Sequence, residues 1–472
     1  MPVVRTLDSL PDPFRLYEIL CTEDKGFVLE SGKGGRYSYV GCGEAMRFLF
    51  RRDGTYEISV GEAKISGQGR DPFELLRDFF GRYRLYSHPS LNNFSGGGIG
   101  LFSYDLARFV EKIPEETEDD LKLPVIDLIV PTFFVELDHE KNKTHLIALS
   151  DSNAYDAESF QTLCAQLDSV EKALEVALES ASYPEPSINE GEPLGTSPDE
   201  ANLTSDEFER LVSKAIDYIY AGDLFQVNLS VRFSRRFSSD PITLYRALRQ
   251  INPAPYMAFL DFKSYAVVSS SPELLLKVEG RELSTRPIAG TRKRGGSDKE
   301  DMAKVNELIG NEKERAEHLM LVDLERNDLG RVSEYGSVHV DEFMSVEKYS
   351  HVIHIVSNVR GKLGRGKDTF DAIRAVFPGG TITGAPKARA MEIIEELEPH
   401  SRGLYTGSIG WVGFNGDTEL NIAIRTLLVK DGTAYAQAGS GIVADSVPEY
   451  EYKESIRKAE AMLKALRETE PV

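Results

Sequence analysis

The sequence predicts an α+β protein in which large, mostly antiparallel β-sheets pack together with helices outside them. The stretch Phe225–Phe233 alternates strictly between apolar and polar residues, which is the period of a strand with one buried face. Other long strand patterns are mixed with helical patterns in no regular βαβ order, and this favours antiparallel sheets. The chain has 472 residues, 41% of them hydrophobic, which is enough for a sizeable core.

The charge and cysteine content exclude several classes of partner and site. A formal net charge of −21 argues against non-specific binding of nucleic acid or of an anionic membrane. An anionic substrate therefore needs a metal or a local group of cations, such as the run Arg286–Arg294. The cysteines Cys21, Cys42 and Cys164 have no CxxC spacing, which argues against a thiolate zinc site and is typical of a reducing compartment. No segment resembles a signal peptide or a membrane span, so we expect a cytoplasmic protein.

The first region, residues 1–182, is predicted to mix short helices and strands, and Asp12 with Pro13 opens its first helix. The elements expected after it are strands at 27–29 and 37–40, a helix at 101–108 after the close-packed glycines of 95–100, a hairpin of strands at 126–137 and 145–149, and an amphipathic helix at 151–182. Residues 183–203 are rich in Pro, Glu, Ser and Gly and are expected to form a linker.

The second region, residues 204–472, is predicted to be catalytic and to begin with a capping box of Thr204 and Glu207 on a helix that ends at Gly222. The polar face of the alternating strand that follows borders either solvent or a polar cavity. The remaining elements expected are strands at 257–262, 266–269, 274–278, 337–340, 351–359, 407–414, 422–429 and 434–438, and helices at 311–330, at 388–398 and after an N-cap at Ser446.

Two pairs of carboxylates have the same spacing on two predicted helices. Glu314 and Glu317 lie on one face of the helix at 311–330, and Glu451 and Glu454 repeat this spacing on the last helix. Taken alone, Glu314 is a capping carboxylate and Glu317 a solvated charge. Two helices that each present such a pair suit Mg²⁺, which binds oxygen ligands and keeps positions open for water and substrate. The sequence therefore predicts a Mg²⁺ site for an anionic substrate.

Two glycine-containing segments resemble nucleotide-binding loops only superficially. Gly379–Lys387 has the wrong spacing for a phosphate loop, and Pro386 lacks a backbone donor there. Gly439–Ala444 is not followed at once by a helix, as a dinucleotide fingerprint requires. Both are expected to be loops whose N–H groups can bind a carboxylate. His351 and His354 lie on opposite faces of a predicted strand, and the residues alone leave core, surface and functional roles open.

Several motifs spread over nearly the whole chain are long and specific. They are Arg36–Tyr39, Phe225–Ser230, Ser271–Glu273, Arg286–Thr291, Glu314–Arg331, Gly379–Met391 and Glu451–Lys458. Together they resemble the chorismate-utilising enzymes, which include anthranilate synthase component I, aminodeoxychorismate synthase component I, and the isochorismate and salicylate synthases. The resemblance implies the fold of anthranilate synthase component I.

The resemblance also implies roles for individual residues. Glu317 and Glu454 are expected to bind Mg²⁺, with Glu314 and Glu451 beside them, and the metal is expected to bridge to the ring carboxylate of chorismate. Glu273 corresponds to the general acid that protonates the departing C4 hydroxyl. The other positions that the resemblance places at the substrate are Gln226, Ala289, His354, Thr381, Arg425, Gly439, Ser440, Gly441 and Lys458.

Three positions distinguish activities within the family. Members that use water as nucleophile have a lysine where this chain has Gln226, and an amide cannot act as that base; ammonia needs none. Many aminodeoxychorismate synthases have a nucleophilic lysine where this chain has Ala289, so a covalent lysine intermediate is excluded. Ala289, and Ile353 before His354, resemble the anthranilate synthases instead.

The motifs Phe225–Ser230, Phe377–Gly384 and Tyr405–Gly410 look closest to aminodeoxychorismate synthases of the Bacillus type. They imply amination of chorismate to 4-amino-4-deoxychorismate, for 4-aminobenzoate and folate synthesis. Since Cys42 lacks the His-Gln that follows a glutaminase nucleophile, a separate glutamine amidotransferase subunit is expected to supply ammonia. The alternative is anthranilate synthase component I.

A third hypothesis is a non-catalytic tryptophan sensor. The complete set of four glutamates described above argues against it. The residues that resemble the family's tryptophan-binding elements are Glu30, Ser31, Asn252, Pro253, Tyr256 and Met257.

Overall fold

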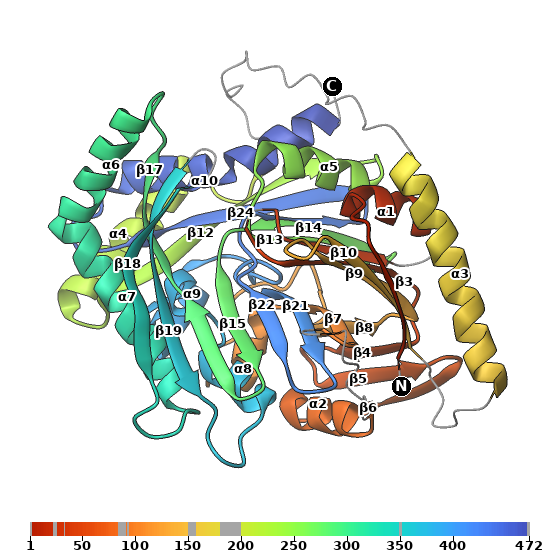
Figure 1. Cartoon of the computed structure of the whole chain (residues 1–472). Coiled ribbons are helices and arrows are strands. Elements are labelled where there is room, and N and C mark those ends of the chain that lie inside the picture. Colours follow the sequence, from red (N-terminus) through yellow and green to blue (C-terminus); the bar gives the residue numbers. More distant parts are fainter. Residues whose placement is uncertain are drawn as a thin grey trace.

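The computed structural model describes residues 2–21, 26–32, 34–83, 91, 94–149, 157–179, 200–348 and 352–469. In this described part, twelve strands form each of two stacked sheets, and the strand pairings are antiparallel throughout (Figure 1). Helices cover the outer faces of both sheets. The predicted α+β class and the predominance of antiparallel strands are confirmed.

The first sheet runs from edge to edge as β1 (Val3–Leu7), β10 (Lys143–Ala148), β9 (Phe133–Asp138), β3 (Tyr37–Cys42), β2 (Gly26–Glu30), β13 (Tyr256–Asp261), β14 (Tyr265–Ser271), β23 (Thr426–Lys430), β24 (Thr433–Ile442), β12 (Gln226–Arg236) and β11 (Glu200–Ala201), with β20 (Gly384–Ala385) also on β12. The second runs as β17 (Ile288–Lys293), β19 (Val352–Lys362), β16 (Glu282–Arg286), β15 (Leu274–Glu279), β22 (Thr418–Asn421), β21 (Ser408–Gly413), β7 (Gly97–Phe102), β8 (Ile126–Val130), β4 (Met46–Phe50), β5 (Thr55–Val60) and β6 (Ala63–Gln68), with β18 (His339–Lys348) on β19.

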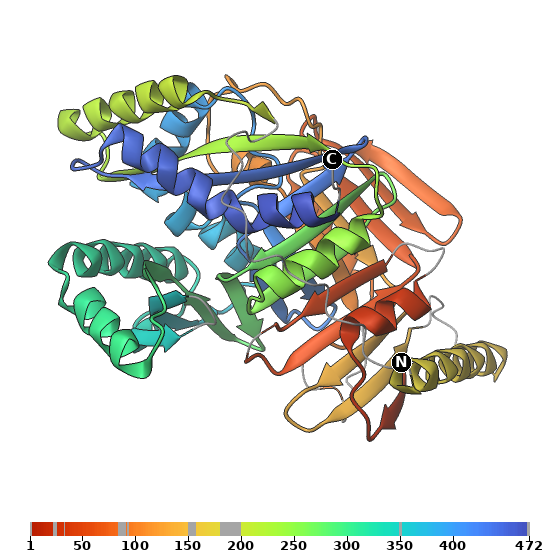
Figure 2. The ribbon, with the colours of Figure 1, turned by 90° about the horizontal axis from the view of Figure 1, so that it is seen from above.

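The helices fall into two groups according to the sheet they cover, as Figure 2 shows from above. Those packed on the first sheet are α1 (Pro13–Leu20), α3 (Ala157–Glu179), α4 (Ser205–Ala221), α5 (Pro241–Ile251), α9 (Lys387–Leu397) and α10 (Pro448–Thr469). Those on the second are α2 (Pro72–Gly81), α6 (Asp298–Gly310), α7 (Glu312–Gly330) and α8 (Thr369–Val376), and the short 3₁₀ helices are η1 (Tyr104–Phe109) and η2 (Gly380–Ile382). No helix of this described part is apolar enough over sufficient length to span a bilayer.

The core between the sheets is built from strands on both sides of the predicted linker. Phe27 and Tyr39 from the first sheet meet Ile99 and Trp411 from the second, and all are nearly or fully buried. The register pairs β2 with β13 and β7 with β21. The two regions of the chain therefore share both sheets.

The chain crosses between the sheets at short segments that the sequence analysis did not find. Pro131 separates β8 from β9, so the strand predicted at 126–137 is two strands in different sheets. The strand predicted at 422–429 begins only at Thr426, with β23, because residues 422–425 cross from β22 in the second sheet to β23 in the first, and Arg425 has a φ of 52°. Apolar residues lie on both sides of each crossing, so the hydrophobic pattern did not locate the break.

The glycines at 97–100 form strand β7 rather than a loop before a helix. Leu101 and Phe102 continue that strand, and only a 3₁₀ turn follows, so the helix predicted at 101–108 is wrong. The expected close packing is confirmed, because a Cβ on Gly100 would lie 1.9 Å from the carbonyl oxygen of Asp127.

Several helix ends confirm the predicted capping. Asp12 and Asn311 cap α1 and α7, and Thr204 forms the reciprocal capping box on α4, which ends at Gly222 with a φ of 85°. The N-cap predicted at Ser446 is wrong: α10 begins at Pro448, and the Ser446 hydroxyl accepts a hydrogen bond from the Val443 N–H instead.

Other expectations meet the limits of the described residues or differ from the structure. His351 and residues 183–199 of the expected linker lie outside the described residues. Phe225, expected on the apolar face of its strand, precedes β12 and is 73% exposed. Cys21 and Cys42 form a disulfide with a Cα–Cα distance of 5.6 Å, a pairing that their spacing did not suggest.

The close approach at Gly100 can be tested against a glycine with open space. Gly100→Ala should lower the free energy of unfolding by about 1–3 kcal/mol or more, since its Cβ would overlap the β8 backbone. Gly81→Ala, at the end of α2, is the control, because a Cβ there would lie within 4 Å of no atom of the described residues around it. It should change the free energy of unfolding by about 0.5 kcal/mol or less. Urea unfolding measures both; equal stabilities of the two variants would contradict this packing.

Candidate active site

Two of the chain crossings lie side by side and carry two predicted site residues. Glu273 lies between β14 and β15, and Arg425 lies between β22 and β23. The Ile422 N–H donates to the Glu273 carbonyl over 3.0 Å, and the Ser270 N–H donates to the Arg425 carbonyl over 3.1 Å. The crossings thus satisfy each other's backbone groups where neither sheet's ladder can.

Glu273 is a buried acid. It is 5% exposed, and burial raises the pKa of its carboxyl to about 7, although the Thr381 hydroxyl, the Ile288 N–H and the Lys458 charge lower it in part. Among the described residues, neither Glu273 Oε1 nor Thr381 Oγ1 makes a hydrogen bond of standard geometry. Buried polar atoms without partners are costly and point to a ligand that supplies them.

The loop that carries Thr381 is held by strand β12. Asn228 donates from Nδ2 to the Thr381 carbonyl and from its backbone N–H to the Thr383 carbonyl, both over 2.9 Å. The polar face of β12 therefore borders the interior, which decides between the alternatives left open by the sequence. Further along this face Ser230 and Arg232 are buried and bonded to Glu398 and Asp120. Asn228 was not among the residues assigned to the site, although its place on this face was visible in the alternation.

Gly439, Ser440 and Gly441 lie within strand β24, paired with β12, so the loop expected at 439–444 is wrong for these residues. A Cβ on Gly439 would lie 2.3 Å from the Leu229 carbonyl oxygen, and one on Gly441 would lie 2.3 Å from Nε2 of Gln226. The glycines thus let β12 and the Gln226 side chain approach closely. Strand β23 pairs only with residues 433–436 of β24, so alternate N–H groups at 439–441 lie outside the ladder with β12, and their binding of a carboxylate stays a prediction.

Two cations meet at the end of β24. Lys458 of α10 donates from Nζ to the Gly439 carbonyl over 3.0 Å and pairs with Glu454 over 2.9 Å. Arg425 donates to the Lys458 carbonyl, and its burial lowers the pKa of its guanidinium. These groups give an acidic protein a local positive centre for a carboxylate.

The opposite wall is formed by β17 and β19. His354 Nδ1 lies 3.2 Å from the carbonyl oxygen of Gly290, and burial and the Arg425 charge lower the pKa of its imidazole. Ala289 precedes Gly290 and pairs with Ile355. Ile353, in contrast, is fully buried in a cluster with residues of α6 and faces away from the site.

The predicted metal ligands lie on α7 and α10, at two sides of this region. Glu314 pairs with Arg292 over 2.9 Å, and Glu454 is held as an anion by Lys458. Burial raises the pKa of Glu317, and the charges of Glu314, Glu454 and Glu451 raise it further although Lys313 opposes them. Among the described residues, no three acidic, histidine or cysteine side chains lie close enough to form a metal site.

The predicted ligands are all carboxylates, and the Mg²⁺ site stays a prediction. Mutual repulsion between Glu317 and the α10 carboxylates is the electrostatic condition that such a cation relieves, and carboxylate oxygens are the ligands Mg²⁺ prefers. Binding would require Glu314 and Glu454 to share their charge between a basic partner and the metal.

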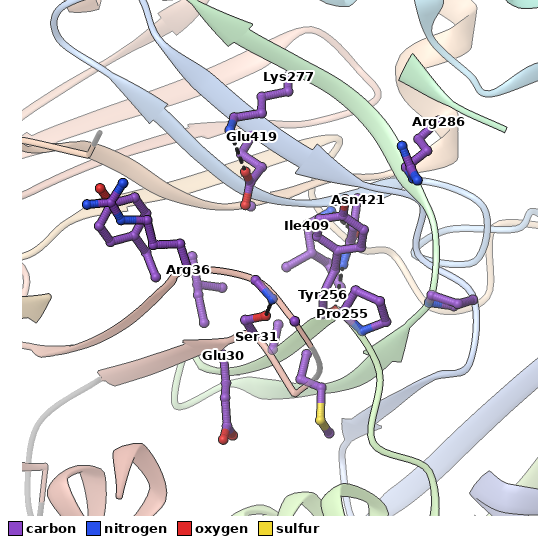
Figure 3. A pocket seen from close by; sticks show the side chains of 18 of the residues that line it. Glu30, Ser31, Arg36, Pro255, Tyr256, Lys277, Arg286, Ile409, Glu419 and Asn421 are labelled. Atoms are coloured by element: carbon purple, nitrogen blue, oxygen red, sulfur yellow. Dashed lines mark hydrogen bonds and ion pairs between the residues drawn. The ribbon is translucent and has the colours of Figure 1, made fainter. Parts of the chain in front are cut away.

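A cavity of about 860 Å³ lies between β2, β13 and the second sheet (Figure 3). Its lining includes Pro272 and Ile288, which lie next to Glu273. Ser31, Tyr256 and Met257, which the sequence analysis assigned to a possible tryptophan site, are among its lining residues, and tryptophan binding stays a prediction. Glu30 is also at its wall, but its carboxylate points away and accepts from Tyr245 and Arg249. Asn252 and Pro253 are not among the lining residues, and Asn252 caps α5.

The sequence family follows from direct comparison. A model of the chorismate binding enzymes matches residues 27–464. The chain belongs to this family. It is 47% identical to aminodeoxychorismate synthase component 1 of Bacillus subtilis (strain 168), over 94% of this chain and 92% of that protein. It is 43% identical to anthranilate synthase component 1 of Acetivibrio thermocellus, over 98% of this chain and 94% of that protein.

The fold comparison agrees with the sequence. The crystal structure of anthranilate synthase component I from Streptococcus pneumoniae TIGR4 is similar with a TM-score of 0.77 and 37% identity, covering 91% of this chain and 92% of that one. The expected fold and the expected chorismate-utilising family are therefore confirmed, and the chain is an enzyme of this family.

In this chorismate-binding enzyme, the buried Glu273 should cost stability. The Glu273 carboxyl loses its proton near pH 4.5 in the unfolded chain but only near pH 7 in the folded protein. The parent therefore has its full stability below pH 4.5 and loses stability as the pH rises to about 7. Glu273→Gln, which cannot ionise, should therefore raise the free energy of unfolding above pH 7 by on the order of 2–3 kcal/mol.

Urea unfolding on either side of this pH window tests the effect. Near pH 4.5 the Glu273→Gln variant and the parent should have similar free energies of unfolding. The control Glu62→Gln, at an exposed residue, should match the parent at every pH. A Glu273→Gln variant that gains no stability above pH 7 would contradict the buried-acid assignment.

Proposed function

We propose that this chain is component I of an aminodeoxychorismate synthase. It aminates chorismate at C4, giving 4-amino-4-deoxychorismate for 4-aminobenzoate and folate synthesis. The observation that carries the proposal is the arrangement of Gln226 and Asn228 where strand β12 begins. Its motif resembles that of the aminodeoxychorismate synthases, Gln226 lies against Gly441, and Asn228 holds the Thr381 loop. The 47% identity to the Bacillus subtilis aminodeoxychorismate synthase component supports the same choice.

The site residues have different roles, which follow from their charges. Glu273, with a pKa of about 7, is protonated often enough at neutral pH to donate a proton to the departing C4 hydroxyl, which leaves as water. Arg425 and Lys458 hold the enolpyruvyl carboxylate, while His354 lies beside the ring. Thr381 and Gly439–Gly441 shape the wall against which the substrate rests.

The nucleophile is ammonia. Gln226 cannot act as a general base toward water, and Ala289 provides no amine for a covalent intermediate, so ammonia attacks the ring directly and loses its extra proton afterwards. Relatives named component 1 imply a second component, and we assign to it the glutamine amidotransferase activity that supplies ammonia.

Magnesium is part of the proposal. Glu317 and Glu454, with Glu314 and Glu451 beside them, would hold Mg²⁺, which supplies positive charge for the ring carboxylate of chorismate. The residues of the chain then bind, orient and protonate the substrate around that charge.

Anthranilate synthase component I is the second candidate, favoured by Ala289 and by 43% identity to a named anthranilate synthase component. That enzyme aminates C2 and expels pyruvate. Ile353, the other residue that resembles those enzymes, faces the α6 cluster and not the site, which weakens its value as a marker. A non-catalytic sensor is disfavoured by the buried acid and cations gathered around Glu273.

The product distinguishes the two enzymes. We expect the purified chain, given chorismate, Mg²⁺ and an ammonium salt, to form 4-aminobenzoate only after an aminodeoxychorismate lyase is added. Fluorescent anthranilate formed without the lyase would identify the second candidate. Glutamine should not replace ammonium until an amidotransferase subunit is added; turnover with glutamine alone would refute the separate-subunit proposal.

The proposed magnesium ligands can be tested by one substitution on α7 and one on α10. Glu317→Gln and Glu454→Gln should each reduce kcat/KM by about a hundredfold or more at saturating Mg²⁺, because a ligand to the substrate-bridging metal is lost. Exposed Glu312→Gln on α7 is the control and should remain active. Full activity of the ligand variants after metal chelation would exclude the assignment.

A further inference from the structure

A fully buried arginine lies between the two segments that form the wall beside Glu273. Arg402 follows α9 and is 2% exposed, with the ring centroids of Tyr104 and Tyr405 at 5.1 and 5.5 Å from its Cζ. Placing a guanidinium in such a position is costly unless its charge and its donors are satisfied.

All three nitrogens of Arg402 are partnered. Nε and Nη2 donate to the two carboxylate oxygens of Glu398 over 2.9 and 2.8 Å, which is the two-pronged geometry of a guanidinium–carboxylate pair. Nη2 also donates to the Asn228 carbonyl over 2.7 Å, and Nη1 donates to the Ile382 carbonyl over 3.0 Å. Arg402 thus bonds to strand β12 and to η2 at the same time.

These two carbonyls belong to the segments that place Thr381. Ile382 is the next residue in η2, and Asn228 makes the bonds to the Thr381 and Thr383 carbonyls described above. Arg402 therefore bonds to both segments that make this contact. Glu398 is held in turn by the N–H and hydroxyl of Ser230, over 2.9 and 2.8 Å.

Apolar residues of similar volume would stabilise the fold as well as the buried Arg402–Glu398 pair or better. Stability alone therefore does not explain why the pair is there. The planar guanidinium of Arg402 fixes the distance between the Asn228 and Ile382 carbonyls, because its N–H donors have fixed directions. A lysine ammonium, which is a single point of charge, cannot do this. Arg108 offers a comparison, because it pairs with Glu395 of the same helix α9 and with Asp105 but makes no bond to the pocket.

We infer that Arg402 is a positioning residue for the active site: it clamps β12 against η2 and thereby sets Thr381 against Glu273. The inference rests on the proposed chorismate chemistry only for its kinetic readout, since the clamp itself is a matter of contacts.

The test compares Arg402→Lys with Arg108→Lys. Each variant keeps a positive charge and loses hydrogen bonds from a guanidinium to buried carboxylates, so both should melt at a lower temperature. Chorismate consumption with ammonium, measured whatever the product, should show kcat reduced by about ten- to a hundredfold in Arg402→Lys alone, because small displacements in a site have effects of this size. Added guanidinium should restore part of the activity of Arg402→Ala.

Hydrogen exchange gives a readout that does not depend on turnover. Backbone amides of 225–230 and 379–385 should exchange faster in Arg402→Lys than in Arg108→Lys. Should the arginine variant fail to fold, Asn228→Ala removes the Nδ2 bond to the Thr381 carbonyl, the contact that Arg402 is inferred to hold in place, and should lower kcat in the same way.

The outcomes are separable. If the parent consumes no chorismate, the proposed function fails and the exchange data still decide the clamp. If the two arginine variants match in kcat, KM and exchange, or if Asn228→Ala retains full kcat, Arg402 is an ordinary structural ion pair and the inference is overturned.

Discussion

The organisation of the site depends on the chain passing from one sheet to the other at two neighbouring points. A strand within a sheet must alternate its side chains and give its backbone groups to its neighbours. At 272–273 and 422–425 the chain is released from both requirements, and the two segments bond to each other instead. Glu273 and Arg425 can therefore project between the sheets, into a region that ordinary strand positions would fill with apolar side chains.

Burial then sets the charges at this place. The same exclusion of water that keeps the Glu273 carboxyl partly protonated lowers the pKa of His354 and of Arg425. The site thus holds a partly protonated acid close to Arg425 and Lys458, within a chain of net charge −21. The carboxylates of α7 and α10 lie at the outer side of this arrangement, where Lys458 and Arg292 balance two of them.

The sequence predicted most of the elements and much of the site, because these depend on local patterns. Capping residues located the ends of α1, α4 and α7, and alternation identified the two faces of β12. The breaks at Pro131 and near Arg425 were missed, since apolar residues continue on both sides of each crossing and do not show that the chain changes sheet. The placement of Gly439–Gly441 in a strand was missed for a related reason: three small residues suggest a turn unless the partner strand is known.

Long-range partners were beyond any local pattern. Nothing near Arg402 in the sequence indicates that its guanidinium bonds to Asn228 and Ile382, and nothing near Glu30 indicates that its carboxylate turns to Arg249. Motif resemblance assigned the residues that face the substrate. It did not show which residues hold those in place, because that depends on the packing of segments far apart in the chain.

The sharing of both sheets by the two regions has a consequence during synthesis on the ribosome. Strands β2 and β7 are made early, but their partner β13 emerges only after the linker, and β21 only after most of the second region. Until then the nascent chain presents open, apolar sheet edges, which are the surfaces most prone to pair with other chains. Folding of the core must therefore wait for nearly complete translation, and the interval favours binding by a chaperone over independent folding of the first region.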